Sequence, residues 1–127
     1  MAALIHLDTH VLAWLYLADV DLLSATAREL IERDELATSP MAVLELTYLH
    51  EVGRLRVDGP TVLASLGDEL GLTIDSTPFG DVVATAQGMT WTRDPFDRLI
   101  AAHALAAGAI LLTRDERLRA RVAGATW

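Results

Sequence analysis

The apolar and polar positions of the chain predict short strands that alternate with helices. Residues 3–7 form an apolar run without alternation, as in a strand buried on both faces of a parallel sheet, and Asp8-Thr9 ends it. Further strands are expected at residues 36–38, 72–75 and 109–113, with an edge strand at 125–127. Strand signals therefore recur along the whole sequence.

Helix starts are marked by capping residues and prolines. Ser39-Pro40 and Asp94-Pro95 each place an N-cap residue before a proline at the first helical position. Together with Ser24 and Gly59-Pro60, they predict helices over residues 24–35, 40–52, 59–71 and 95–108. Helices are also expected over 10–18 and 78–86, and in a short Arg-rich segment after residue 113.

Strands separated by helical segments predict an α/β fold built on a doubly wound parallel sheet. The 127 residues suit a single domain, because the sequence contains neither an internal repeat nor a linker. Sites in such sheets form beyond the carboxyl ends of the strands, where the strand order reverses. The residues that follow strands are therefore the first candidates for function.

The composition excludes several classes of protein. Without cysteine, the chain offers no disulfide framework, no thiolate metal site and no cysteine nucleophile, which fits a reducing compartment. The apolar N-terminus lacks a basic region and is interrupted by His6, Asp8 and His10, which a signal peptide or membrane span would avoid. We therefore expect a cytoplasmic protein that does not enter a membrane.

The net charge of −8 argues against a nucleic-acid partner, because phosphate binding normally needs a basic surface. The average hides an asymmetry, however. Between Arg93 and Arg121 there are six Arg and four acidic residues, so this segment is slightly basic. The charge alone therefore does not exclude a nucleic acid.

Two acidic residues follow predicted strands. Asp8 comes directly after the first strand, and Asp115 lies just beyond Thr113, the end of the fourth. If these strands are neighbours, the two carboxylates converge at one edge of the sheet. For Asp115 two interpretations stay open, because the segment from Thr113 to Glu116 also fits a helix capping box.

Glu45 lies within an apolar stripe of the helix 40–52. The residues of this stripe are Met41, Leu44, Tyr48, Leu49 and Val52, whereas Glu51 lies on the other side. A carboxylate at the edge of the stripe would reach water, but a buried one is costly without a cation or hydrogen-bond donors. We therefore favour a functional role for Glu45.

Asp97 lies at the third position of the helix that begins at Asp94-Pro95, where an acid can also compensate the helix dipole. Asp94 already supplies the cap, and Asp97 continues along a face that contains Ala101, Ala104 and Gly108. This face permits close packing. We therefore expect the Asp97 side chain to point inward.

Inward carboxylates repel one another, each pair by about 4 kcal/mol at roughly 4 Å and an effective dielectric near 20. A cation must therefore lie among them. Ligands that are all oxygen, without paired His or Cys, select Mg²⁺ or Mn²⁺ rather than Zn²⁺. Such a site can activate water and stabilise charge on a phosphate, which is the chemistry of phosphodiester hydrolysis.

Four segments, LIHLDTHVLAWL, SPMAVLELTYL, DPFDRLIAAHAL and AILLTRDERL, resemble the acidic motifs of PIN-domain ribonucleases in the same order. The sequences of these segments are most similar to those of VapC-type toxins of VapBC toxin-antitoxin systems. By this resemblance, Asp8, Glu45, Asp97 and Asp115 are the metal-binding and catalytic acids, and Thr113 supplies a supporting hydroxyl. The family often has Asn where this chain has His10. The implied activity is that of an endoribonuclease dependent on Mg²⁺, for which Mn²⁺ can substitute.

The resemblance also implies a fold and partners. The fold is a three-layer PIN-like arrangement with five parallel strands in the order 3-2-1-4-5, which places strands one and four side by side. The partners are an RNA substrate, a second copy of the chain, and a cognate VapB-type antitoxin whose C-terminal segment lies in a groove near the acids. Arg98 and Arg114 are candidates for contacts with RNA phosphates; Arg54 and Arg56 fit a solvated loop better.

Two other interpretations were compared with this one. A degenerate PIN-like domain that binds RNA or a protein without turnover is the alternative, against which the presence of all four acids argues. A phospho-acceptor receiver domain has a similar length and acidity, but it needs a Lys after the last core strand, and this chain contains no Lys.

Overall fold

The computed structural model describes residues 2–127 and contains one parallel sheet. Its strands are β1 (Leu4–Leu7), β2 (Glu35–Thr38), β3 (Thr73–Ile74) and β4 (Ile110–Leu112), in the order β3-β2-β1-β4. β1 pairs with β2 on one side and with β4 on the other, all in parallel. The prediction of a parallel α/β fold is therefore confirmed, and the residues that follow β1 and β4 lie at the same edge.

The prediction of five strands was wrong, because the sheet has four. The segment 125–127 forms only an isolated parallel bridge, in which Thr126 lies opposite Leu112. Thr126 donates to the carbonyl of Leu111, and Thr113 donates to the carbonyl of Thr126, both at 3.0 Å. The chain reaches β4 through a turn at Gly124, whose φ is 81°, so a single residue pairs before the segment ends.

The helices cover the sheet and begin where the capping signals indicated. They are α1 (Thr9–Tyr16), α2 (Ala25–Arg33), α3 (Pro40–Glu51), α4 (Gly59–Leu70), α5 (Phe79–Gln87), α6 (Pro95–Ala106) and α7 (Glu116–Arg121), with a 3₁₀ turn, η1, at Val20–Leu22. The side chains of Ser24, Ser39 and Asp94 accept hydrogen bonds from the first turns of α2, α3 and α6. None of these helices is both long and apolar enough to cross a membrane, within residues 2–127.

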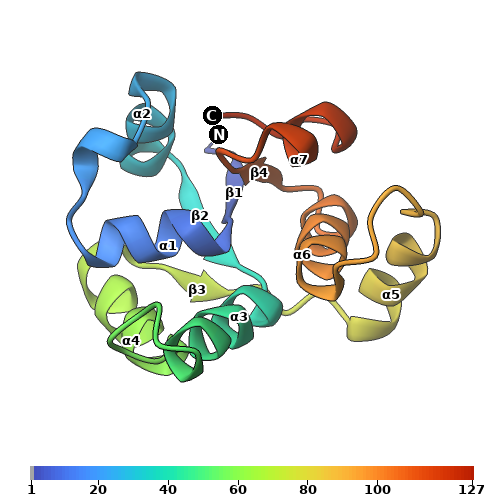
Figure 1. Cartoon of the computed structure of the whole chain (residues 1–127). Coiled ribbons are helices and arrows are strands. Elements are labelled where there is room, and N and C mark those ends of the chain that lie inside the picture. The colour runs from blue at the N-terminus through green and yellow to red at the C-terminus, as the bar shows by residue number, and fades with distance from the viewer. Residues whose placement is uncertain (1) are drawn as a thin grey trace.

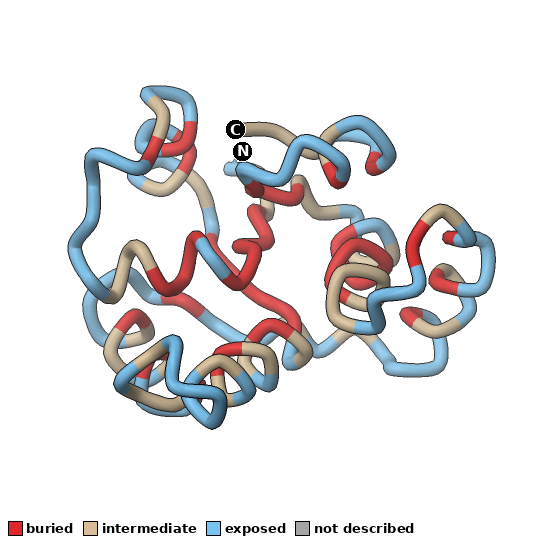
Figure 2. The backbone as a smooth tube through the Cα atoms, viewed as in Figure 1, coloured by how far each residue is buried: buried red, intermediate tan, exposed pale blue. Residues whose placement is uncertain are grey.

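Helices lie on both sides of the central strands. In Figure 1, α1, α2 and α4 lie to the left of β1 and β2, whereas α5 and α6 lie to the right. Figure 2 shows that the buried residues concentrate along β1 and on the parts of α1 and α6 that face it. The site at the end of β1 is therefore held between packed elements rather than on a free loop.

The apolar stripe predicted on α3 is not the buried face of that helix. Ala42 and Leu46 are the buried residues, whereas Leu44, Tyr48 and Val52 are 52%, 49% and 51% exposed. The sequence of α3 is apolar around most of its circumference, so the periodicity alone does not select the face that packs. The stripe that contains Glu45 instead borders the solvent.

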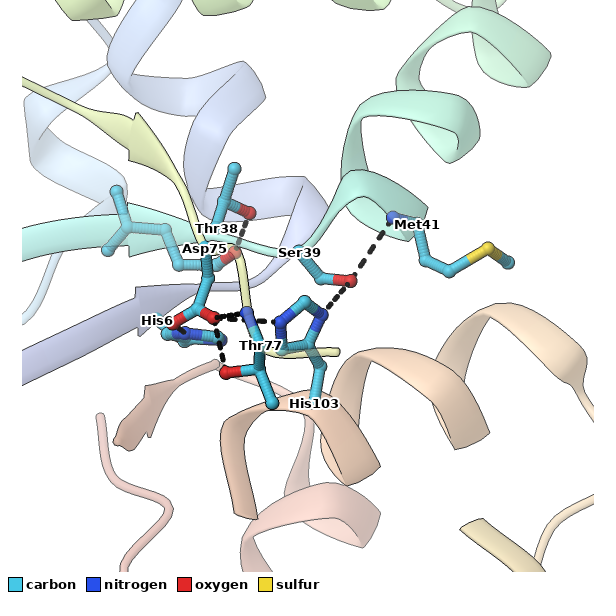
Figure 3. A network of polar contacts seen from close by, with 8 residues as sticks. His6, Thr38, Ser39, Met41, Asp75, Thr77 and His103 are labelled. Atoms are coloured by element: carbon cyan, nitrogen blue, oxygen red, sulfur yellow. Dashed lines mark hydrogen bonds and ion pairs between the residues drawn. The ribbon is translucent and has the colours of Figure 1, made fainter. Parts of the chain in front are cut away.

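A buried polar network joins the sheet to the two helices that carry acidic candidates (Figure 3). The carboxylate of Asp75, just after β3, lies 2.8 Å from Nε2 of His6 and 3.0 Å from Nε2 of His103. His103 Nδ1 lies 2.9 Å from the hydroxyl of Ser39. Because Ser39 is buried and also caps α3 through the amide of Met41, we assign the network a structural role.

The network favours the ionised form of Asp75. Burial opposes the charge, but hydrogen bonds from Thr77, His6 and His103 outweigh it and hold the pKa of Asp75 well below its usual range. Since a carboxylate only accepts hydrogen bonds, both histidines donate from Nε2. The network thereby fixes β1, α3 and α6 relative to one another. These are the elements that carry Asp8, Glu45 and Asp97.

Candidate functional site

Asp8 occupies the end of β1 and is 6% exposed. Its Oδ1 accepts a hydrogen bond from the amide of Thr9 at 2.8 Å, and its Oδ2 accepts one from the hydroxyl of Thr113 at 2.6 Å. Burial raises the pKa of Asp8, and these two hydrogen bonds only partly oppose the effect. Asp8 is thus a rigidly held carboxylate without a basic partner in the described part of the chain.

Glu45 is connected to Asp8 through a single residue. The Thr9 amide donates to Asp8, while the Thr9 hydroxyl donates to Oε1 of Glu45 at 2.5 Å. Burial and the charge of Asp8 raise the pKa of Glu45, against the hydrogen bond from Thr9. Glu45 is only partly buried, so its other oxygen can face a ligand or water.

Asp97 is the most perturbed acid of the group. Burial, followed by the charges of Asp94, Asp8, Glu45 and Asp115, raises its pKa to about 7. With Asp97, these acids come from four separate regions of the chain, because Asp94 and Asp97 both lie at the start of α6. Within the described part of the chain, none of these acids forms an ion pair with an arginine that would offset the repulsion.

Asp115 has the capping role that the sequence left open. Its Oδ1 accepts from the amide of Leu118 at 3.0 Å and so caps α7. Thr113 does not cap the helix; its hydroxyl donates to Asp8 and accepts from the amide of Asp115 at 3.1 Å. Capping does not remove Asp115 from the site, because it lines the same crevice as Asp8.

The crevice has a volume of about 380 Å³. It is lined by Asp8, His10, Trp14, Arg114, Asp115 and Glu116. Trp14 did not stand out in the sequence, although its position four residues after His10 places both on one face of α1. The Arg114 guanidinium lies 5.8 Å from the centre of the Trp14 ring. Arg114 is exposed and thus available to an anion.

Arg98 has backbone partners that the sequence did not predict. Its guanidinium donates to the backbone carbonyls of Ala86, Gln87 and Thr92, at 2.9, 3.4 and 3.4 Å. It thereby fixes the end of α5 and the loop that leads to α6. Three of the five N–H donors of the guanidinium are thereby engaged, so the phosphate contact proposed for Arg98 would depend on the remaining two.

The chemistry of the acidic residues fits a hard divalent cation. The donors are carboxylate oxygens, and the raised pKa of Asp97 reports a charge repulsion that a cation would relieve. Within residues 2–127, no three His, Asp or Glu side chains already lie in a ligating arrangement. The donor set therefore fits Mg²⁺ or Mn²⁺ by its chemistry, and binding would draw the carboxylates closer together.

Comparisons with known proteins agree with this arrangement. The PIN domain family model matches residues 5–124. Ribonuclease VapC22 from Mycobacterium tuberculosis is 37% identical over 116 residues, which cover 89% of this chain and 88% of that protein.

Two solved complexes share the fold at lower identity. VapBC2 from Rickettsia felis, bound to a DNA fragment from its promoter, superposes with a TM-score of 0.67 at 17% identity, over 96% of this chain and 95% of the other. DNA-bound VapBC from Salmonella typhimurium superposes with a TM-score of 0.59 at 20% identity, over 98% of this chain and 96% of the other. The chain therefore belongs to the PIN-domain family, among the VapC-type members.

Proposed function

We propose that this protein is a Mg²⁺-dependent endoribonuclease and the toxin of a type II toxin-antitoxin pair. The observation that carries the proposal is the connection of Asp8 to Glu45 through the amide and hydroxyl of Thr9, with Asp115 in the same crevice as Asp8. Burial, followed by the charges of Asp94, Asp8, Glu45 and Asp115, raises the pKa of Asp97 to about 7, which fits a cluster of acids that lacks a cation. The 37% identity to Ribonuclease VapC22 supports the same activity. We further propose that the chain is one domain and acts in the cytoplasm.

Asp8, Glu45, Asp97 and Asp115 would hold the cation. When bound, a divalent cation lowers the pKa of water and neutralises negative charge on a phosphodiester. Asp8 offers oxygens whose direction is set by Thr113 and Thr9. Glu45 is oriented by the Thr9 hydroxyl. The chain's own contribution is therefore a set of carboxylates positioned in advance by hydroxyl and amide donors.

RNA would enter as an unpaired segment, whose bases can splay apart while its backbone reaches the acids in the crevice. Arg114 is the candidate for a phosphate contact, since it is exposed at the rim next to Asp115. Its planar guanidinium can bind a phosphate through two parallel hydrogen bonds. The acids and Arg114 thus present both a cation site and an anion contact.

Cleavage of a single-stranded RNA tests the activity. We expect cleavage with Mg²⁺, none in EDTA, and a loss of at least about 100-fold in Asp8→Asn and Asp97→Asn. Asp68→Asn, on the exposed side of α4, removes the same charge and should cleave as the unaltered chain does. Cleavage that persists in EDTA would refute the metal mechanism.

The alternative is a PIN-like domain that binds RNA or a protein without turnover. Calorimetry with Mn²⁺ distinguishes the two. Absence of Mn²⁺ binding, together with absence of cleavage, would favour the alternative. Binding that disappears in Glu45→Gln but not in Glu51→Gln, an exposed acid on the same helix, would favour the nuclease.

A homodimer is proposed through the exposed face of α3. Leu44, Tyr48 and Val52 repeat at four-residue spacing and are about half exposed, and Phe79 at the start of α5 is 67% exposed. Tyr48 also packs against Phe96, with ring centres 5.8 Å apart. A contiguous apolar face of this kind is typical of an interface between protein chains.

The antitoxin is proposed to contact a second surface, in addition to the groove near the acids that the family resemblance implies. A pocket of about 420 Å³ lies between the end of α1 and the loop after α3, and it is lined by Tyr16, Leu17, Arg54, Leu55, Arg56 and Val57. Apolar walls with two arginines suit a peptide segment that carries apolar and acidic side chains. This assignment gives Arg54 and Arg56, for which the sequence favoured a solvated loop, a contact with a protein.

A further inference from the structure

Trp14 is the centre of an aromatic cluster at the rim of the acidic crevice. The ring of Trp127 lies 5.7 Å from it in an edge-to-face arrangement, and the ring of His10 lies 6.1 Å away. The Arg114 guanidinium lies over the Trp14 ring at 5.8 Å. We call these four residues the Trp14 cluster. It joins α1, the loop after β4 and the C-terminal residue beside Asp8 and Asp115.

The net charge of the chain makes such a cluster useful. At −8, the protein as a whole repels the phosphates of RNA, and the crevice itself contains Asp8, Asp115 and Glu116. Binding energy that does not depend on charge must therefore contribute to substrate binding. Stacking of a base on an aromatic ring is of this kind, and it accepts any base because every base has a π-face.

Packing against the hydrophobic core is a property that Trp14 shares with the other tryptophans of the chain. A second tryptophan, Trp91, carries Arg117 over its ring at 5.7 Å, which is the same type of pair. Both tryptophans are partly buried. Only Trp14, however, lines the crevice that contains Asp8. The Trp14–Arg114 and Trp91–Arg117 pairs are thus chemically alike, but only the first can be reached by a substrate bound at Asp8.

We propose that Trp14 stacks against a base of the RNA strand whose backbone lies at the acids. The proposal rests on the ribonuclease function proposed above. The base takes the place over the Trp14 ring that the Arg114 guanidinium occupies in the free protein, and Arg114 turns to a phosphate. Trp127, packed edge-on, holds the Trp14 ring in position. Trp14 is therefore a substrate-binding residue and not a catalytic one.

The test compares two labelled probes of equal length and charge: a short single-stranded RNA of mixed sequence, and the same ribose-phosphate backbone without bases. Binding is measured in the Asp97→Asn background, so that the RNA is not cut. Trp14→Leu removes the ring, Trp14→Phe keeps a smaller ring, and Trp91→Leu is the matched control.

We expect Trp14→Leu to weaken binding of the RNA about tenfold, which corresponds to about 1.4 kcal/mol, and to leave binding of the abasic backbone within about twofold. Trp14→Phe should recover part of the loss, and Trp91→Leu should bind like the background. An equal loss on both probes would overturn the proposal, because it would mean that Trp14 supports the fold. No loss on either probe would overturn it as well.

Cleavage with Asp97 intact separates this proposal from the function on which it rests. Trp14→Leu should raise KM about tenfold and change kcat much less. If the unaltered chain cleaves RNA and Trp14→Leu has the same KM, stacking is refuted and the nuclease stands. If the unaltered chain does not cleave but Trp14→Leu selectively loses the base-bearing probe, stacking stands and the nuclease is refuted.

Discussion

The hydroxyl of Thr113 donates a hydrogen bond of 2.6 Å to Oδ2 of Asp8, although the two residues are 105 positions apart in the chain. The contact forms because β1 and β4 are paired, with Leu7 opposite Leu112. The same hydroxyl accepts from the amide of Asp115. One side chain therefore holds the buried carboxylate and the start of α7 in a fixed relation.

Thr113→Val keeps the shape of this side chain but removes its hydroxyl. We expect Mn²⁺ affinity and RNA cleavage to fall about 10- to 100-fold, as is usual when the partner of a metal ligand is lost. Thr113→Ser should restore most of both. Calorimetry and cleavage rates measure the effect, and Thr85→Val, which removes a hydroxyl bonded to a backbone carbonyl of α5, is the control. If Thr113→Val had the Mn²⁺ affinity and cleavage rate of the unaltered chain, the role of Thr113 in positioning Asp8 would be contradicted.

Metal binding should depend on pH through Asp97. Burial and the neighbouring acids raise its pKa to about 7, so a cation must displace a proton below that pH. Apparent Mn²⁺ affinity should fall about tenfold for each pH unit below 7 and level off above it. Calorimetry across this range measures the slope. In Asp97→Asn the contribution of this group to the slope should disappear.

Stability without metal should show the opposite trend. The folded-state pKa of Asp97 lies above the 3.8 of an exposed aspartate, so between about pH 4 and pH 7 this group binds more protons in the folded chain than in the unfolded chain. The free energy of unfolding therefore decreases as the pH rises through this window. Urea unfolding in EDTA should show a smaller decrease for Asp97→Asn than for the unaltered chain. Equal slopes would mean that Asp97 is not perturbed.

Gly59 should tolerate no side chain. A Cβ at this position would lie 2.0 Å from the carbonyl oxygen of Val43, where α3 and α4 approach each other. We expect Gly59→Ala to lower the free energy of unfolding by about 3 kcal/mol, the upper end of the usual range for overpacking. Gly80→Ala on α5, where the new Cβ meets nothing within 4 Å, should be neutral or stabilising by up to about 1 kcal/mol. Chemical denaturation compares the two variants.

The proposed dimer predicts a change in mass for a single substitution. Leu44→Glu places a charge in the middle of the exposed face of α3 and should yield a monomer, because burying an unpaired carboxylate at an interface is costly. Leu70→Glu, at a partly exposed leucine on α4, is the control and should keep the mass of the unaltered chain. Light scattering coupled to gel filtration measures the mass. A dimer in both variants would place the interface elsewhere.

The order of elements and the helix starts were predictable, because capping residues and prolines act locally. The side chains of Ser39 and Asp94 accept hydrogen bonds from amides two or three residues ahead, so each helix start is encoded by neighbouring residues. The pairing of β1 with β4 followed from the expected topology. The fifth strand did not form, since its length depends on a turn at Gly124 that the apolar pattern does not describe.

The site was predictable only in part. Asp8, Glu45 and Asp97 do influence one another, but the buried face of α3 was misjudged because that helix is apolar nearly all round. Asp75 follows β3 as Asp8 follows β1, yet it binds two histidines whose positions no local pattern links to it. The use of Arg98 by backbone carbonyls could not be seen either, because it depends on where the loop after α5 passes.

The position of β4 beside β1 also matters for synthesis of the chain. During translation Asp8 emerges from the ribosome 105 residues before its hydrogen-bond partner Thr113. Domains fold as their segments become available. A nascent chain that has not yet reached β4 therefore lacks the Thr113 contact, and the carboxylate of Asp8 is not held in its final orientation until β4 pairs with β1.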